Sequence, residues 1–132
     1  MSFLLDTNIC SAFLKGNRQV EGRVLLHGGG LYINAIILGE LLTWTMRSNA
    51  PPSRQVVLDE LLQEVTILDV TSDVARKYGE MQAALFDRGT PVPGMDLMIA
   101  ATAVVHNLTL VTHNSQDFVN VPNLRMVDWL TP

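Results

Sequence analysis

The sequence contains a single cysteine, Cys10, among its 132 residues. One thiol cannot form an intramolecular disulfide, and with three scattered histidines it does not make a zinc-binding set. Because Cys10 lies within the apolar stretch Ile9–Leu14, we expect it to be a small residue packed in the core. The chain is therefore not expected to depend on disulfides or zinc for its fold.

Long apolar runs are also absent. No run reaches the roughly 18 residues that indicate a membrane span, and the first residues have neither a basic region nor a small-residue cleavage site. We therefore expect a cytoplasmic protein with no membrane partner. An apolar fraction of 48% and a mean hydropathy of +0.23 indicate a folded chain. Its length fits one domain, residues 1–132.

Basic residues are few, with nine Lys and Arg against thirteen Asp and Glu and a net charge of −4. Phosphate contacts drive affinity for nucleic acids, so this balance counts mildly against such a ligand. Net charge does not describe a local groove, however, and a cluster of carboxylates at a metal site would itself make the total acidic. The Gly28–Gly30 run lacks the Lys and Ser/Thr that follow in a nucleotide-binding P-loop.

Short apolar runs alternate with longer helical stretches along the chain. The runs predict strands at Phe3–Asp6, Leu31–Asn34, Val65–Val70, Thr109–Thr112 and Leu124–Val127. Helices are predicted over residues 8–15, 18–27, 36–48 and 53–63, from the cap Thr71 to about Asp87, and from about Met95 to His106. This alternation indicates an α/β fold whose mostly parallel sheet of about five strands is covered on both faces.

Two carboxylates follow predicted strands. Asp6 closes the first strand, and Asp117 lies five residues after Thr112, where the fourth strand ends. In parallel sheets of this kind, binding sites lie at the carboxyl ends of the strands. Both side chains are therefore expected at one edge of the sheet.

Two further carboxylates stand at the start of apolar helices. Glu40 is the only charged residue in Ala35–Leu42, and Asp96 is the only one in Gly94–Ala101. Each has a structural explanation when taken alone, such as a helix cap for Asp96 or an ion pair with Arg47 for Glu40. Four carboxylates at one edge repel one another unless a cation neutralises them. Oxygen ligands favour Mg²⁺, with Mn²⁺ as a substitute.

The chain resembles the PIN-domain family, and most of all its VapC-type toxins from bacterial toxin–antitoxin pairs. The resemblance covers the whole chain. It is carried in order by the segments Leu4–Asn8, Glu40–Leu42, Asp96–Ala103, Leu110–Phe118 and Leu124–Trp129. The segment beginning at Asp96, followed at the right distance by Thr112–Phe118, is the most specific part.

The resemblance implies a three-layer α/β/α sandwich with a Rossmann-like sheet, and a metal-dependent endoribonuclease acting on tRNA or rRNA. A cognate antitoxin would inhibit it. A homodimer, a larger toxin–antitoxin assembly and operator DNA bound by that complex are also implied. The family's metal-binding and catalytic positions fall on Asp6, Glu40, Asp96 and Asp117. Supporting polar positions fall on Asn8, Thr112 and Asn114. Asn114 stands where some relatives carry an acid, so the number of metal ions stays open.

The resulting hypothesis is that Asp6, Asp96 and Asp117 bind the first metal ion. Glu40 would orient or deprotonate the attacking water, directly or through a second ion. His113 is expected in an exposed loop, with an RNA contact as the alternative. Trp44 and Met46 follow Glu40 on its helix. Two interpretations are left open for them: a position in the core, or a place on an antitoxin-binding surface.

Two other functions compete with the nuclease hypothesis. A phosphatase or a receiver domain would use a strand-end aspartate such as Asp6 as a nucleophile. A receiver would also need a lysine near the end of a late strand, where this chain has Thr112, His113 and Asn114. A non-catalytic RNA-binding or antitoxin-binding relative would be expected to lose acidic ligands, and all four are present.

Overall fold

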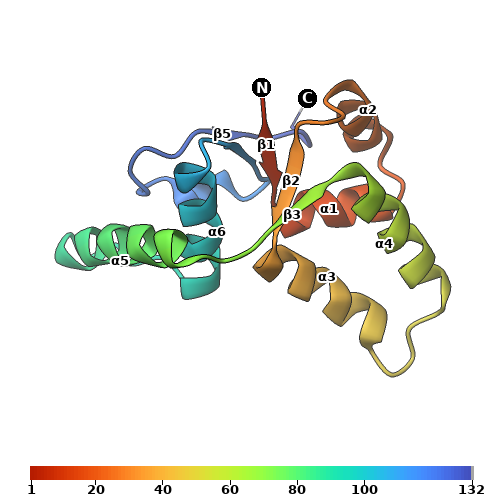
Figure 1. The fold of residues 1–132 in the computed structure, drawn as a ribbon, viewed down its shortest axis with the longest axis horizontal. Coiled ribbons are helices and arrows are strands. Elements are labelled where there is room, and N and C mark those ends of the chain that lie inside the picture. The colour runs from red at the N-terminus through yellow and green to blue at the C-terminus, as the bar shows by residue number, and fades with distance from the viewer. Residues whose placement is uncertain (132) are drawn as a thin grey trace.

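The structure is a computed structural model that describes residues 1–131. The chain alternates strands and helices almost throughout (Figure 1). The strands are β1 (Phe3–Leu5), β2 (Leu31–Asn34), β3 (Thr66–Leu68), β4 (Thr109–Val111) and β5 (Met126–Val127). The helices are α1 (Thr7–Leu14), α2 (Arg18–Leu26), α3 (Ala35–Met46), α4 (Ser53–Glu64), α5 (Ser72–Asp87), α6 (Gly94–Val105) and the 3₁₀ turn η1 (Ser115–Phe118).

The five strands form one sheet in the order β3-β2-β1-β4-β5, and every pair is parallel. From β1 the chain moves outward to β2 and β3, then returns to add β4 and β5 on the other side of β1. The direction of winding therefore reverses between β1 and β4. In open α/β sheets, the crevice at the carboxyl ends of two such strands is where ligands bind.

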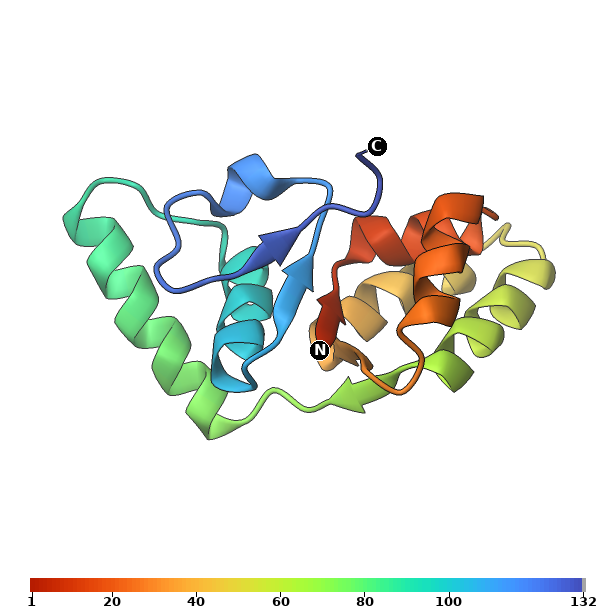
Figure 2. The same ribbon diagram turned by 90° about the horizontal axis from the view of Figure 1, so that it is seen from above.

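The helices cover the two sides of the sheet. Figure 1 shows α1, α3 and α4 on one side and α5 and α6 on the other, and Figure 2 shows the same division from above. This follows from the sheet order, because right-handed crossovers running in opposite directions place their helices on opposite faces. None of the helices in residues 1–131 is both long enough and apolar enough to cross a membrane.

The central strands are buried over their whole length. All three residues of β1 and all three of β4 are buried, with Leu4 and Leu110 fully inaccessible. Each such leucine contributes about 1.5–3 kcal/mol through burial. Cys10 is also fully buried, as expected from the sequence. The core thus centres on the two strands between which the winding reverses, and it fixes their carboxyl ends.

The sequence-based elements are confirmed with shifted ends. All five strands and all six α-helices are present, and the sheet is wholly parallel rather than mostly parallel. Four predicted strands were too long. Asp6 is the cap of α1, β4 ends at Val111 before Thr112, and the edge strands are limited to Thr66–Leu68 and Met126–Val127. The turn η1 was not predicted. An edge strand extends only as far as its single neighbour can pair with it, and local sequence does not record that length.

Candidate functional site

Asp6 lies directly after β1 and is held by three polar groups. It is the N-cap of α1, and its Oδ1 accepts from the backbone N–H of Thr7 at 2.8 Å. Its Oδ2 accepts from the Thr112 hydroxyl at 2.8 Å and from the Asn8 amide at 3.4 Å. Only 6% of Asp6 is exposed. No Lys or Arg in residues 1–131 forms an ion pair with this carboxylate.

Thr112 and Asn8 join the ends of β1 and β4. Thr112 directly follows β4, and its hydroxyl accepts from the backbone N–H of Asn114 at 3.1 Å while donating to Asp6. The Asn8 side chain accepts from the backbone N–H of His113 at 3.0 Å and donates to Thr112 at 3.4 Å. The three residues expected to support the site therefore lie around Asp6, although Asn114 contributes only its backbone.

Glu40 reaches the same region from α3. Its Oε1 accepts from the Thr7 hydroxyl at 2.6 Å. The backbone N–H of the same Thr7 donates to the Asp6 carboxylate. The alternative ion pair with Arg47 is not formed in residues 1–131. Sequence reasoning missed Thr7. Its position directly after the strand-end aspartate was the available signal.

Asn34 was also missed, and it orients the two helices that carry Glu40 and Asp96. It is fully buried at the end of β2, where its Oδ1 caps α3 by accepting from the backbone N–H of Ile37 at 2.9 Å. Its amide donates to the hydroxyl of Thr102 on α6 at 3.0 Å. An asparagine between an apolar strand and an apolar helix is a recognisable N-cap signal. The second bond depends on the tertiary fold.

Asp96 and Asp117 line one crevice beside the end of β4. Asp96 stands in the first turn of α6 and is partly buried, whereas Asp117 is exposed in η1. The loop before α6, residues 90–93, and Asn120 complete the walls of this crevice. Two carboxylates that are distant in sequence therefore face a shared opening.

The four carboxylates influence one another electrostatically. Burial, followed by the charges of Asp6, Asp117 and Glu40, raises the pKa of Asp96 above its usual range. Burial is also the main cause of the raised pKa of Asp6; Glu40 adds to it, and the hydrogen bonds from Thr112, Thr7 and Asn8 oppose it. All four predicted acids are therefore brought to one end of the sheet, where their ionised forms are mutually unfavourable.

The donor set fits a hard cation. The groups that converge are carboxylate, hydroxyl and amide oxygens, which are the ligands of Mg²⁺ and Mn²⁺. Within residues 1–131, no three acidic, histidine or cysteine side chains stand close enough to enclose an ion by themselves. Mg²⁺ usually keeps several waters and is bound through only one or two carboxylates, so an open arrangement suits it. Which of the carboxylates touch the ion stays a prediction.

His113 lies in the loop beside this site and is exposed, as expected. Its Nδ1 lies 2.9 Å from Oδ2 of Asp128, in the segment after β5. The same carboxylate accepts from the Leu130 backbone N–H and the Thr131 hydroxyl. The segment after β5 is therefore tied to the loop that carries Thr112.

Comparison with known proteins is consistent with this geometry. The PIN domain family matches residues 3–124. The tRNA(fMet)-specific endonuclease VapC of Salmonella typhimurium is 32% identical over 130 residues, with 98% of both chains covered. Ribonuclease VapC2 of Rickettsia felis is 31% identical over 134 residues, again with 98% of both covered.

Solved structures agree with the sequence comparison. The structure of DNA-bound VapBC from Salmonella typhimurium superposes with a TM-score of 0.91 at 32% identity, covering 98% of each chain. VapBC2 from Rickettsia felis, bound to a DNA fragment from its promoter, gives a TM-score of 0.90 at 31% identity and covers 98% of this chain and 99% of that one. The chain therefore belongs to the PIN-domain family and, within it, to the VapC ribonucleases.

Proposed function

We propose that the protein is a Mg²⁺-dependent endoribonuclease toxin that hydrolyses phosphodiester bonds in tRNA or rRNA, with Mn²⁺ as a substitute ion. The observation that carries the proposal is the gathering of Asp6, Glu40, Asp96 and Asp117 at the point where the sheet reverses its winding. Relatives named tRNA(fMet)-specific endonucleases in Salmonella typhimurium and Shigella flexneri, at 32% and 33% identity, make tRNA the first substrate to test.

In the proposed mechanism, Asp6, Asp96 and Asp117 would hold the ion together with water molecules, and Thr112 with Asn8 fixes the Asp6 carboxylate. A bound Mg²⁺ supplies positive charge beside the phosphate and makes nearby water more acidic. Glu40 is kept in place by Thr7 and accepts a proton from the attacking water. The water oxygen bonds to phosphorus, the bond from phosphorus to the leaving ribose oxygen breaks, and that oxygen takes a proton from solvent.

The test is cleavage of total cellular RNA by the purified protein with Mg²⁺ or with EDTA. Asp96→Asn is expected to lower the rate by at least about a hundredfold, because a mutated outer partner of a metal site already costs 10–100-fold. The matched control is Asp69→Asn, which removes one exposed carboxylate far from α6 in sequence. Sequencing of the fragment ends identifies the RNA and the cleaved bond.

Three outcomes would contradict the proposal. Cleavage that persists in EDTA or in Asp96→Asn would mean a contaminating nuclease or a different centre. Mg²⁺ binding without cleavage of any cellular RNA would favour a non-catalytic relative. Acyl-phosphate labelling of Asp6 would instead favour a phosphatase or receiver.

We also propose that a cognate VapB-like antitoxin neutralises the protein in the cytoplasm, and that the complex binds operator DNA. The support is the likeness to VapBC assemblies that were solved with DNA. A homodimer is proposed as well. Phe86, Met95 and Val119 are more than half exposed and lie on the α5–α6 and η1 side, where a second copy could cover them. Light scattering of the purified protein, alone and with antitoxin, tests both assemblies.

A further inference from the structure

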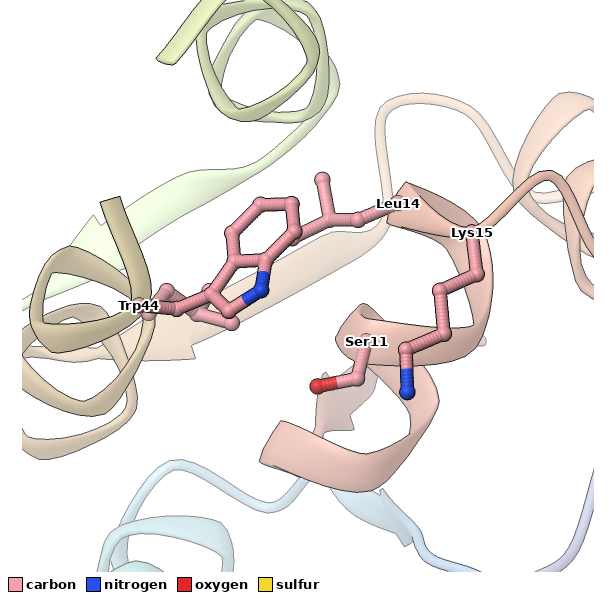
Figure 3. A pocket seen from close by; sticks show the side chains of 5 residues that line it. Ser11, Leu14, Lys15 and Trp44 are labelled. Atoms are coloured by element: carbon pink, nitrogen blue, oxygen red, sulfur yellow. The ribbon is translucent and has the colours of Figure 1, made fainter. Parts of the chain in front are cut away.

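A trough leads away from the candidate active site across α1. Its first hollow is lined by Asn8 and His113 beside the site, and by Ser11 and Lys15 further along α1. Ser11 and Lys15 also line a second hollow, which Trp44 of α3 lines as well. Figure 3 shows Ser11 and Lys15 projecting from α1 on one side and Trp44 facing them from α3. The two hollows are thus neighbours that share part of their wall.

The trough continues to the turn between α3 and α4. Trp44 lines a third hollow as well, together with Arg47 and Arg54. Three neighbouring hollows therefore form a row from Asn8, which donates to Asp6, to the two arginines at the end of α3 and the start of α4.

The charge of this path is opposite to that of the whole protein. The net charge of the chain is −4, yet no Asp or Glu lines any of the three hollows, whereas Lys15, Arg47 and Arg54 do. Within residues 1–131 none of these three cations forms an ion pair. Cations that are left without carboxylate partners in an acidic protein are available for an external anion.

Arg54 is held in place before any ligand arrives. Its Nη1 donates to the backbone carbonyl of Trp44 at 3.0 Å, and its guanidinium carbon lies 5.0 Å from the centre of the Trp44 ring. A guanidinium has five N–H donors, so most of them stay free for phosphate oxygens. Trp44 is half-buried, so it is not a fully buried core residue, and its ring lies beside this arginine. A role for Trp44 in antitoxin binding stays a prediction. Met46 is 72% exposed and is not a core residue.

We propose that this trough is the path of the RNA strand on one side of the cleaved bond, with Lys15, Arg47 and Arg54 contacting backbone phosphates. The proposal rests on the nuclease function proposed above and assigns that function a substrate-binding surface. Grooves that combine separated cations with neutral polar groups follow the backbone of single-stranded nucleic acid. Asn8 lines the first hollow and donates to Asp6, so the row of hollows begins beside the carboxylate cluster, and this position favours the substrate as the occupant.

The experiment measures binding of a fluorescein-labelled single-stranded RNA of about 15 nucleotides and mixed sequence, a length near the upper site size of such grooves. Fluorescence anisotropy is read in EDTA, so that metal-dependent cleavage does not interfere. The test variant is Lys15→Gln with Arg47→Gln, because neither side chain makes a hydrogen bond within residues 1–131. The control is Arg76→Gln with Lys77→Gln on α5, which lowers the net charge equally.

The test pair is expected to reduce the slope of log affinity against log salt by about 1.4, since each single-strand phosphate contact contributes roughly 0.7. Its affinity at low salt should fall about tenfold or more, while the control pair should change it by less than about twofold. Circular dichroism of both pairs checks that the fold is intact.

Equal losses in the two pairs would overturn the proposal, because only net charge would then matter. Unchanged RNA binding by the test pair would overturn it too, and weakened antitoxin binding in that variant would assign the trough to a protein partner. Failure of the nuclease function is separate: it would appear as RNA bound by the wild-type protein through the trough but not cleaved with Mg²⁺.

Discussion

At the scale of single residues, the central carboxylate is held by neutral donors. Asp6 is buried and receives its hydrogen bonds from Thr7, Asn8 and Thr112, none of which carries charge. These bonds fix the direction of the carboxylate without neutralising it. A protein cation in the same place would have competed with an external ion. The arrangement therefore orients the Asp6 carboxylate and leaves its negative charge available to bind a metal ion.

The Thr112 hydroxyl is expected to matter for metal affinity through this orientation. Thr112→Val keeps the shape but removes the donor to Asp6, and it should raise the Mg²⁺ concentration needed for half-maximal cleavage by about 10–100-fold. Thr112→Ser keeps the hydroxyl and should stay within a few-fold of the wild-type protein. The measurement is the initial cleavage rate against Mg²⁺ concentration. Equal behaviour of the valine and serine variants would show that the hydroxyl has no such role.

The sequence indicated the acidic residues of the site better than the residues that hold them. Asp6 and Asp96 were recognisable because a carboxylate beside an apolar strand or helix is costly without a function. Thr7 links Asp6 with Glu40 through its backbone N–H and its hydroxyl. The bond from Thr7 to Glu40 joins residues 33 positions apart, and no local sequence pattern predicts such a bond. Such contacts follow from the sheet order.

At the scale of the elements, Asn34 connects β2 with α3 and α6 through one side chain. Asn34→Ala removes the α3 cap and also the buried hydrogen bond to Thr102, whose hydroxyl keeps its bond to the Met98 carbonyl. The expected cost is about 2 kcal/mol of unfolding free energy, the sum of a typical cap and one lost buried hydrogen bond. Urea unfolding followed by circular dichroism measures it.

The matched control for this variant is Asn17→Ala. Asn17 caps α2 by accepting from the backbone N–H of Val20 at 3.0 Å, and its side chain makes no other hydrogen bond in residues 1–131. Its loss should cost about 1 kcal/mol. If the two variants were equally destabilised, the bond between Asn34 and α6 would contribute nothing beyond the cap.

The helices were predictable because their signals are local, whereas the edges of the sheet were not. Thr71 before α5 and the apolar run after Gly94 mark helix starts by rules that need only neighbouring residues. The turn η1 carries Asp117 but spans only Ser115–Phe118, too short to show a helical period. Its position depends on packing of Phe118, which is buried.

At the scale of the whole molecule, the carboxylate cluster should make the metal-free protein less stable than it could be. Folding raises the pKa of Asp96 through burial and the charges of Asp6, Asp117 and Glu40. The folded state therefore binds this proton more tightly than the unfolded state, so stability falls as pH rises from the ordinary carboxyl pKa, about 3.9. At neutral pH the ionised group opposes folding.

In EDTA at pH 7, Asp96→Asn is accordingly expected to unfold at higher urea concentration than the wild-type protein, and the difference should shrink as pH is lowered toward 4. Mg²⁺ at a hundred times its dissociation constant should add about 2.7 kcal/mol to the wild-type protein and much less to the variant. Asp69→Asn again serves as the control. An identical Mg²⁺ response in all three proteins would place the ion away from Asp96.

Overall charge was the least informative feature of the sequence. A net charge of −4 counted mildly against a nucleic-acid ligand. The fold separates the charges instead, with the carboxylates at the strand ends and Lys15, Arg47 and Arg54 along the trough. Composition does not contain this separation, because it arises only when α1, α3 and α4 pack together.

The hydrogen bond between Thr112 and Asp6 joins residues 106 positions apart in the chain. During translation Thr112 leaves the ribosome 106 residues after Asp6. Until then a nascent chain has no finished catalytic centre, because β4 has not yet paired with β1. On the proposed activity, the ribosome that makes this toxin is protected from it until β4 has been synthesised and has joined the sheet.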